Sequence, residues 1–190
     1  MIAHQIRKSG KISLHVIFIS LMMSHNAYPN YEAYPWQHAF SIAFGRSISH
    51  EGGIIKNIRT ANFEKDNIFS IAHYKQPNHF FRVEGTRNII AGTYSAPHTK
   101  EQIYFGGLSQ SITFMESKNI YFNGELGVVY ANTSTLRIGS RLYIMTNLEL
   151  GININQYYSI GIVKHHFSNA NLTAPNIGEN FLSIVFGVKM

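Results

Sequence analysis

The chain has 190 residues, enough for one domain, and no cysteine, which excludes a disulfide or a thiolate metal site. Tyrosine (11) and phenylalanine (13) are abundant and only 14% of residues are charged, a composition that favours strands. The net charge of +6 would suit nucleic acid, but Arg7, Lys8 and Lys11 carry part of it and no basic cluster follows, so we expect no nucleic-acid partner.

The N-terminal segment has the layout of a secretory signal peptide. Three cations precede an apolar run at 12–23, and small and polar residues follow. The run is shorter than the ~20 apolar residues that a spanning helix needs. A buried N-terminal helix is the alternative. We expect a signal peptide over 1–27, with an uncertain cleavage site near 24–27, and a single domain over 28–190.

The rest of the chain contains eight runs in which apolar and polar residues alternate, as they do in strands with one buried face. In the first run, Phe40, Ile42 and Phe44 share one face, and Ser41 and Ala43 share the other. The predicted strands cover residues 36–46, 66–74, 79–92, 101–115, 119–132, 139–153, 157–168 and 179–190.

Longer and shorter connections alternate between these runs, and KQPN at 75–78 is a short one rich in turn formers. An up-and-down barrel of the outer membrane needs this alternation, with turns on the periplasmic side and loops outside. We therefore predict an all-β fold, an eight-stranded antiparallel up-and-down transmembrane β-barrel. A soluble barrel or sandwich, with its charged face in water, is the alternative.

The polar faces of the predicted strands carry full charges. In a membrane barrel the apolar face would turn to lipid and these charges would pair inside. We expect a paired polar lumen without a catalytic role, formed by Arg82, Glu84, Glu125, Arg141 and Glu149.

The segment KHHFSNANLTAPNIGEN, 164–180, joins the last two predicted strands. Parity with the apolar face of the seventh strand turns Lys164, His166 and Ser168 outward. In the eighth strand, parity turns Asn180 outward and Glu179 inward. A fringe of polar side chains at the membrane interface explains these positions, and so does a catalytic site.

The catalytic reading follows from the chemistry of the side chains. His166 and Ser168 share a face two residues apart, so the imidazole can act as base for the hydroxyl. Asn180 has the parity to orient His166 from the neighbouring strand. An oxyanion hole could come from the amides where the chain leaves the strand, those of Asn169, Ala170 and Asn171.

HxSNA followed by PNxG resembles the PagL-type lipid A deacylases, also called acyloxyacyl hydrolases. The matching residues are His166, Ser168, Asn169, Ala170, Pro175, Asn176 and Gly178. The resemblance implies an eight-stranded outer-membrane barrel with a Ser-His-acid triad on its outer wall. It also implies a lipid A 3-O-deacylase in which Ser168 is the nucleophile and His166 the base. Asn180 stands where the family has an acid, and Asn171 where it tends to have glycine.

The same resemblance points to lipid A or lipopolysaccharide as the partner and to the bacterial outer membrane as the location. Lys164 could bind a lipid A phosphate, although a lysine that snorkels to the interface is the alternative. No metal or cofactor is implied. The sequence leaves a homodimer open. A catalytically weak or inactive barrel with a structural or surface role is the alternative function, because Asn180 is not a carboxylate.

Overall fold

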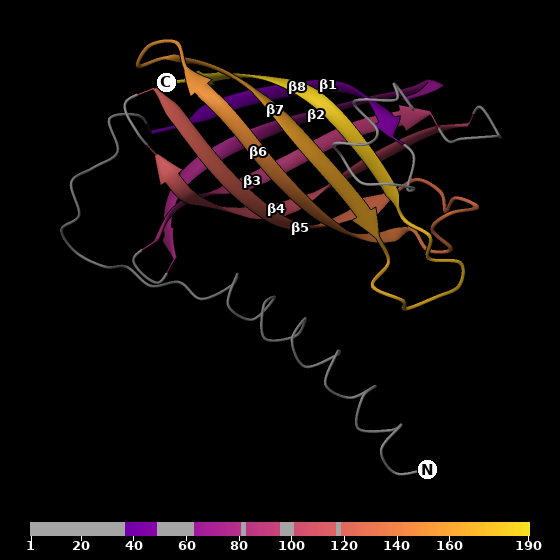
Figure 1. Ribbon diagram of the computed structural model, residues 1–190. Coiled ribbons are helices and arrows are strands. Elements are labelled where there is room, and N and C mark those ends of the chain that lie inside the picture. Colours follow the sequence, from indigo (N-terminus) through magenta and orange to yellow (C-terminus); the bar gives the residue numbers. More distant parts are fainter. Residues whose placement is uncertain (1–36, 49–62, 81–82, 96–100, 117–118) are drawn as a thin grey trace. The chain divides into compact units, whose positions relative to one another are not determined.

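The computed structural model describes residues 37–48, 63–80, 83–95, 101–116 and 119–190, all within one compact unit, Tyr34–Met190. These residues form a closed antiparallel barrel (Figure 1), which confirms the predicted fold. The strands are β1 (Ala39–Ile48), β2 (Phe63–Phe80), β3 (Val83–Ser95), β4 (Gln102–Glu116), β5 (Ile120–Ala131), β6 (Leu142–Asn153), β7 (Tyr158–Ser168) and β8 (Glu179–Lys189). The predicted signal peptide lies outside the described residues and stays a prediction.

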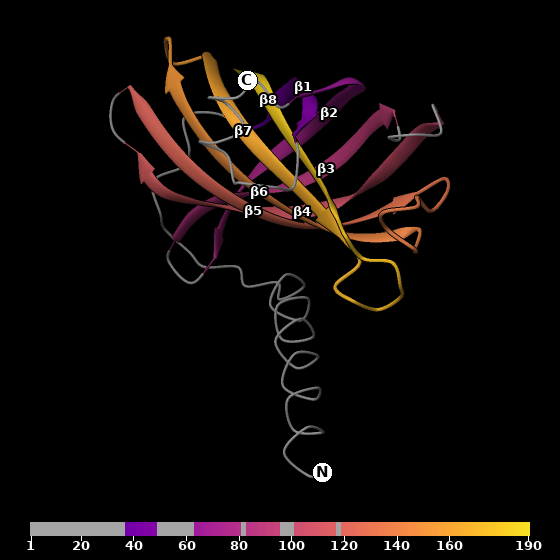
Figure 2. The same cartoon turned by 45° about the vertical axis from the view of Figure 1, so that its right-hand side comes forward.

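Each strand pairs with the next along the chain, and β8 pairs with β1 to close the barrel. The longer connections, which include 132–141 and 169–178, lie at one end, called the loop end here. The shorter ones lie at the other, the turn end, where β8 also finishes (Figure 2). The predicted alternation of connections is thus confirmed. Within the ranges that the structure describes, no helix has the length and hydropathy of a membrane span.

One predicted turn is wrong. The segment KQPN, 75–78, lies within β2, which continues to Phe80. Pro77 is opposite Thr86 of β3, whereas the pairing of β2 with β1 ends at Lys75. Pro77 therefore has a neighbouring strand on one side only, and such an edge position tolerates a residue that lacks a backbone N–H. The β2–β3 hairpin extends past β1 at the turn end.

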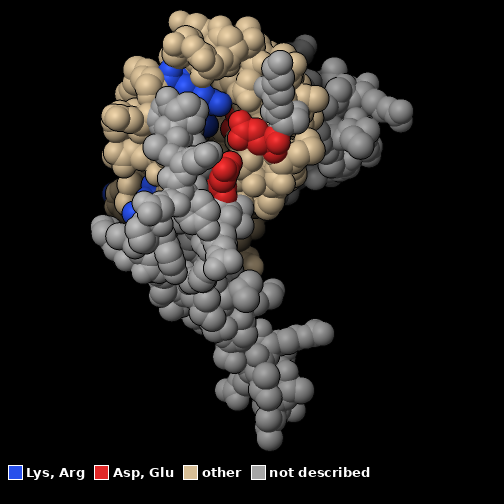
Figure 3. All heavy atoms as spheres, turned by 90° about the vertical axis from the view of Figure 1, so that its left-hand side faces the viewer, with Lys and Arg blue, Asp and Glu red and all other residues tan. Residues whose placement is uncertain are grey.

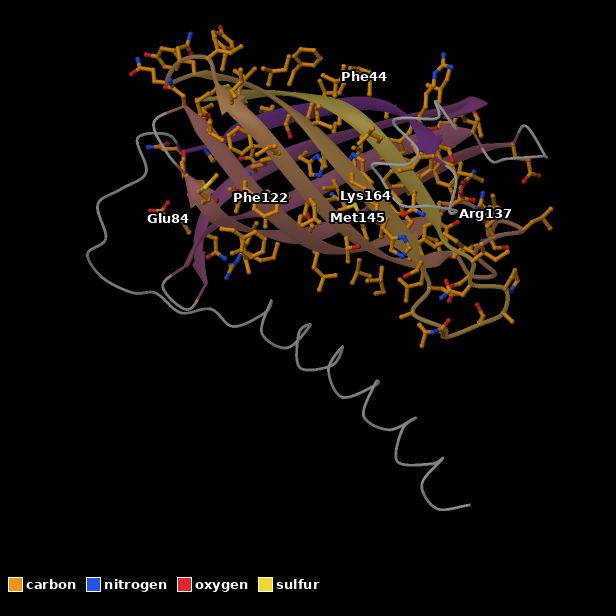
Figure 4. All side chains as sticks on the ribbon, viewed as in Figure 1. Phe44, Glu84, Phe122, Arg137, Met145 and Lys164 are labelled. Atoms are coloured by element: carbon orange, nitrogen blue, oxygen red, sulfur yellow. The ribbon has the colours of Figure 1, made fainter. Side chains whose placement is uncertain are left out.

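The outward face of the barrel is apolar. Phe40 and Phe44 of β1 are 49% and 51% exposed, while Ser41 and Ala43 between them are buried; Figure 4 shows Phe44 on the outer side of β1. The same alternation continues in β8, where Ile184 is exposed. A wall of this kind faces lipid, because contact of so much apolar side-chain surface with water would be unfavourable. The alternative of a soluble barrel with its charged face outside is wrong.

Aromatic side chains fill the interior near the loop end. Phe69 stacks on Phe181 with ring centroids 4.4 Å apart, and Tyr94 lies 5.1 Å from Phe181. Phe105 and Phe167 complete the layer, with centroids 5.3 Å apart. Burial and packing of aromatic rings stabilise this end. The interior is therefore only partly the polar lumen that the sequence predicts.

A polar cluster around Glu125 of β5 lies inside the barrel, on the turn-end side of the aromatic layer. Asn88 and Asn147 donate from Nδ2 to the Glu125 carboxylate at 2.8 and 2.6 Å. Ser109 donates to it as well, and His73 Nε2 lies 3.3 Å from Oε2. Several polar side chains thus surround the one buried carboxylate of Glu125. Their hydrogen bonds offset the cost of burying its charge inside the barrel.

Charged groups also gather at the turn end, which Figure 3 shows face on. Glu149 Oε2 lies 3.8 Å from Lys75 Nζ, and Glu149 Oε1 accepts from the Tyr121 hydroxyl at 2.7 Å. Glu116 and Lys189 approach to 4.0 Å. The predicted lumenal positions of Glu125 and Glu149 are thus confirmed.

Two other lumenal predictions are wrong, and Arg82 lies outside the described residues. Glu84 is exposed, because the pairing of β3 with β4 begins only at Gly85 and Glu84 belongs to the part of the hairpin that extends past the barrel. Arg141 is also exposed, because it precedes Leu142, the first residue of β6, and so belongs to the loop.

We expect Glu125→Leu to lower the free energy of unfolding by about 3–5 kcal/mol, because it removes the acceptor that His73 and three other side chains share. Glu125→Gln keeps an acceptor of the same shape and should cost less. Urea unfolding in detergent micelles measures both. Equal unfolding midpoints for Glu125→Leu and the wild type would contradict this role of Glu125.

Candidate active site

The last two strands carry the polar residues that the sequence singles out. In β7 the side chains of Phe167 and His165 are fully buried inside the barrel, so Ser168, His166 and Lys164 take the outward positions, where each is partly exposed. Their predicted outward direction is confirmed. Figure 4 shows Lys164 on β7 between the two ends of the barrel.

His166 lies directly opposite Asn180 in the pairing of β7 with β8. Its Nδ1 is 3.0 Å from Asn180 Oδ1. An amide oxygen only accepts, so this contact places the ring hydrogen on Nδ1 and leaves Nε2 with a lone pair. Histidine in this tautomer can take a proton from a neighbouring hydroxyl. Asn180 is 9% exposed, so its contact with His166 is largely shielded from solvent.

Glu179 points into the barrel. Its side chain is fully buried, and Oε1 lies 3.6 Å from Nε of Arg137 in the 132–141 loop. The register of β7 with β8 runs without a bulge through this point, so no local shift turns Glu179 outward. The residue that faces His166 is therefore an amide, Asn180.

Gly178 gives the His166 ring its space. A Cβ at this position would lie 3.0 Å from Cε1 of His166 and 2.9 Å from the Phe167 carbonyl oxygen. The backbone of Gly178 also has φ +81°, in the region that side chains rarely adopt. A side chain at 178 would therefore strain the backbone, and the His166 ring would have to shift by a few tenths of an ångström.

The segment after Ser168 has an unusual backbone. Ala170 and Asn171 have φ of 53° and 61°, a conformation that costs non-glycine residues free energy and concentrates at functional sites. Asparagine is among the side chains that adopt it most readily. Asn171 thus takes the conformation for which glycine would be suited.

Asn176 and Asn169 hold this segment in place. Asn176 Oδ1 accepts from the Asn169 amide at 2.8 Å, and its Nδ2 donates to Asn171 Oδ1 at 2.9 Å. Asn169 is fully buried and donates from Nδ2 to Thr173. The Asn169 amide, one of three predicted oxyanion donors, is therefore already engaged. Neither the Ala170 nor the Asn171 amide donates to another described residue.

The 132–141 loop packs against the 169–178 loop, a contact that sequence reasoning missed. The Arg137 carbonyl accepts from Ile177 at 2.8 Å, and the Gly139 amide donates to Pro175 at 2.7 Å. Thr173 donates to the Gly139 carbonyl at 2.9 Å. A Cβ at Gly139 would lie 2.5 Å from the Ala174 oxygen, so only glycine allows this approach.

We expect Asn176→Ala to lower activity about 10–100-fold while the barrel still folds. It removes the hydrogen bonds of Asn176 with the Asn169 amide and with the Asn171 side chain, and loss of one well-placed oxyanion donor costs ~10²–10³-fold in other hydrolases. Initial rates of fatty acid release from lipopolysaccharide give the effect. Full activity in Asn176→Ala would show that the loop needs no such support.

Comparisons with known proteins identify the family of the chain and support its fold. The sequence matches the family model Lipid A 3-O-deacylase (PagL) over residues 69–189, well over half of the chain. The crystal structure of the outer membrane enzyme PagL is similar with a TM-score of 0.60 and 14% identity, over 80% of this chain and 99% of that one. Ail of Yersinia pestis, an outer membrane protein, gives a TM-score of 0.43 and 11% identity over the same shares. No curated protein sequence matches the chain.

A closed eight-stranded barrel with an apolar outer wall and long loops at one end defines a β-barrel of the bacterial outer membrane. Within that class, the chain belongs to the PagL family of lipid A 3-O-deacylases. The predicted resemblance and location are thus confirmed. The family is one of hydrolases that act on lipid A.

Proposed function

We propose that this chain is a lipid A 3-O-deacylase that uses Ser168 as nucleophile and His166 as general base. The observation that carries the proposal is the 3.0 Å contact of His166 Nδ1 with Asn180 on the outer wall, two residues from Ser168. The contact orients the His166 ring on the same outward face of β7 as Ser168, and this face is turned to lipid. The family match supports lipid A as the substrate.

In the first step, Ser168 Oγ attacks the carbonyl carbon of the acyl ester and its proton passes to His166 Nε2. The carbonyl oxygen becomes an oxyanion that the amides of Ala170 and Asn171 can stabilise. The tetrahedral intermediate then expels the sugar alkoxide, which takes the proton from His166. This leaves the acyl group as an ester of Ser168.

In the second step, His166 takes a proton from water, and the resulting hydroxide attacks the acyl-Ser168 ester. Collapse of this intermediate returns the proton from His166 to Ser168 and releases the fatty acid. Asn180 holds the ring in the productive tautomer during both steps, but it adds no negative charge to stabilise the imidazolium. A slow reaction is therefore expected.

The test is incubation of the purified barrel with lipopolysaccharide in detergent, followed by fatty acid analysis and tandem mass spectrometry of the remaining lipid A. Release of the acyl chain from the 3-position supports the proposal. Release from another position would contradict the 3-O assignment.

A catalytically weak or inactive barrel is the second candidate, favoured by the amide at 180. It predicts intact lipid A in the same assay. The homodimer that the sequence leaves open stays a prediction, for which crosslinking in outer membranes is the test.

A further inference from the structure

One polar side chain beside the candidate active site has no role in the proposed reaction. Thr146 of β6 is directly opposite His166, on the side away from Asn180. Its neighbours Met145 and Asn147 are buried inside the barrel and Thr146 is exposed, so the Thr146 side chain lies on the outer wall. Side chains directly opposite each other have Cβ atoms ~5 Å apart. The Thr146 hydroxyl is therefore a neighbour of the His166 ring.

Thr146 interrupts an apolar face. The other outward side chains of β6 are all aliphatic: Leu142, Ile144, Leu148, Leu150 and Ile152. The structure describes β5, β6 and β7 without a gap, and the Thr146 hydroxyl forms no hydrogen bond with another residue that it describes. A hydroxyl in hydrocarbon costs free energy unless it finds a hydrogen-bond partner. A molecule from the lipid phase that carries an oxygen at this level would supply that partner.

In the proposed reaction, the acyl chain of the substrate passes this level. Ser168 is the last residue of β7, at the loop end, and Thr146 lies one row, ~7 Å, nearer the turn end. The sugar stays at the membrane interface while the chain extends into the hydrocarbon, so the first carbons beyond the ester lie at the level of His166. Asn180 occupies the β8 side of the His166 ring. The chain therefore takes the β6 side, along Thr146.

We propose that Thr146 selects acyl chains that carry a hydroxyl group close to the scissile ester. The Thr146 hydroxyl both donates and accepts, so it can hydrogen-bond such a group, whereas an unsubstituted chain leaves it without a partner. The proposal rests on the proposed function, because the ester must be at Ser168 for its chain to meet Thr146. Threonine is frequent in strands, but the place of Thr146 opposite His166, on an otherwise aliphatic face, points to a contact with substrate.

Binding tests this selectivity without activity. The Ser168→Ala barrel in detergent is titrated with two synthetic sugar lipids that differ only in the 3-O-acyl chain, which is 3-hydroxytetradecanoyl in one and tetradecanoyl in the other. This parent should prefer the hydroxylated lipid about 3–10-fold, the contribution of one neutral hydrogen bond. Adding Thr146→Val, which keeps the shape of the side chain, should abolish the preference. Adding Thr146→Ser, which keeps the hydroxyl, should retain it.

Thr93→Val is the matched control and should keep the preference. Thr93 precedes the buried Tyr94, so it takes an outward position, and it lies on β3, which β4 and β5 separate from β6.

Equal binding of the two lipids by the parent, or an unchanged preference after Thr146→Val, would overturn the proposal. An equal loss of binding for both lipids after Thr146→Val would also overturn it, because such a loss indicates packing alone. The failure of the proposed function shows itself separately, as absence of fatty acid release from lipopolysaccharide by the barrel that retains Ser168. Heat-modifiable mobility on gels confirms that each variant is folded.

Discussion

Ser168→Ala is expected to lower lipid A deacylation at least ~10³-fold while the barrel remains folded. Removal of the nucleophile from a serine hydrolase leaves only the contribution of substrate binding and the oxyanion donors. Ser168 is partly exposed on the outer wall, opposite Ile144, so loss of its hydroxyl leaves no buried group without a partner. The measurement is the initial rate of fatty acid release from lipopolysaccharide.

Ser70→Ala is the matched control for this variant. Ser70 also takes an outward position, on β2 between exposed Ile68 and Ala72, but lies outside the β7–β8 wall. It should keep the wild-type rate. If Ser168→Ala retains more than about a tenth of the wild-type rate, another group is the nucleophile.

Asn180→Asp is expected to raise kcat about 10–1,000-fold. The present contact already sets the tautomer of His166, because the oxygen of Asn180 faces Nδ1. What it lacks is negative charge opposite the imidazolium that forms in the transition state. An opposite charge at hydrogen-bond distance is worth ~1.4–4 kcal/mol, which converts to this range of rates. Aspartate has the size of asparagine, so the change tests charge alone.

Two further variants bracket this prediction. Asn180→Ala removes the acceptor and should lower kcat below the wild-type value. Asn132→Asp makes the same isosteric change on an exposed loop-end residue and should have no effect. A rate for Asn180→Asp equal to that of the wild type would mean that Asn180 does not act through His166. A lower rate would mean that the wall rejects the added charge.

The direction in which the site residues point could be predicted from the sequence, because successive side chains of a strand point to opposite faces. Once Ile160 and Ile162 define the lipid face of β7, His166 and Ser168 follow by parity, and the same holds for Asn180 in β8. Parity also predicts correctly that Glu179 points into the barrel. There its buried carboxylate lies beside Arg137. Regular strands carry this information over several residues.

Features that depend on distant neighbours could not be predicted. The sequence around Pro77 predicts a turn. Pro77 lies instead in a strand, at an edge position, because the pairing of β2 with β1 ends at Lys75, and the sequence does not indicate that end. The engagement of the Asn169 amide depends on Asn176, which lies across an irregular loop. The contact of Gly139 with the 169–178 loop joins segments that no periodic pattern connects.

The role of Ser168 in lipid A deacylation is tested most directly by mass spectrometry of lipid A from a Gram-negative host that expresses the wild-type chain or Ser168→Ala. Wild-type cells should contain lipid A lighter by one ester-linked acyl chain, and Ser168→Ala cells should not. Unchanged lipid A from cells with a folded wild-type barrel, or equal deacylation by Ser168→Ala, would contradict it.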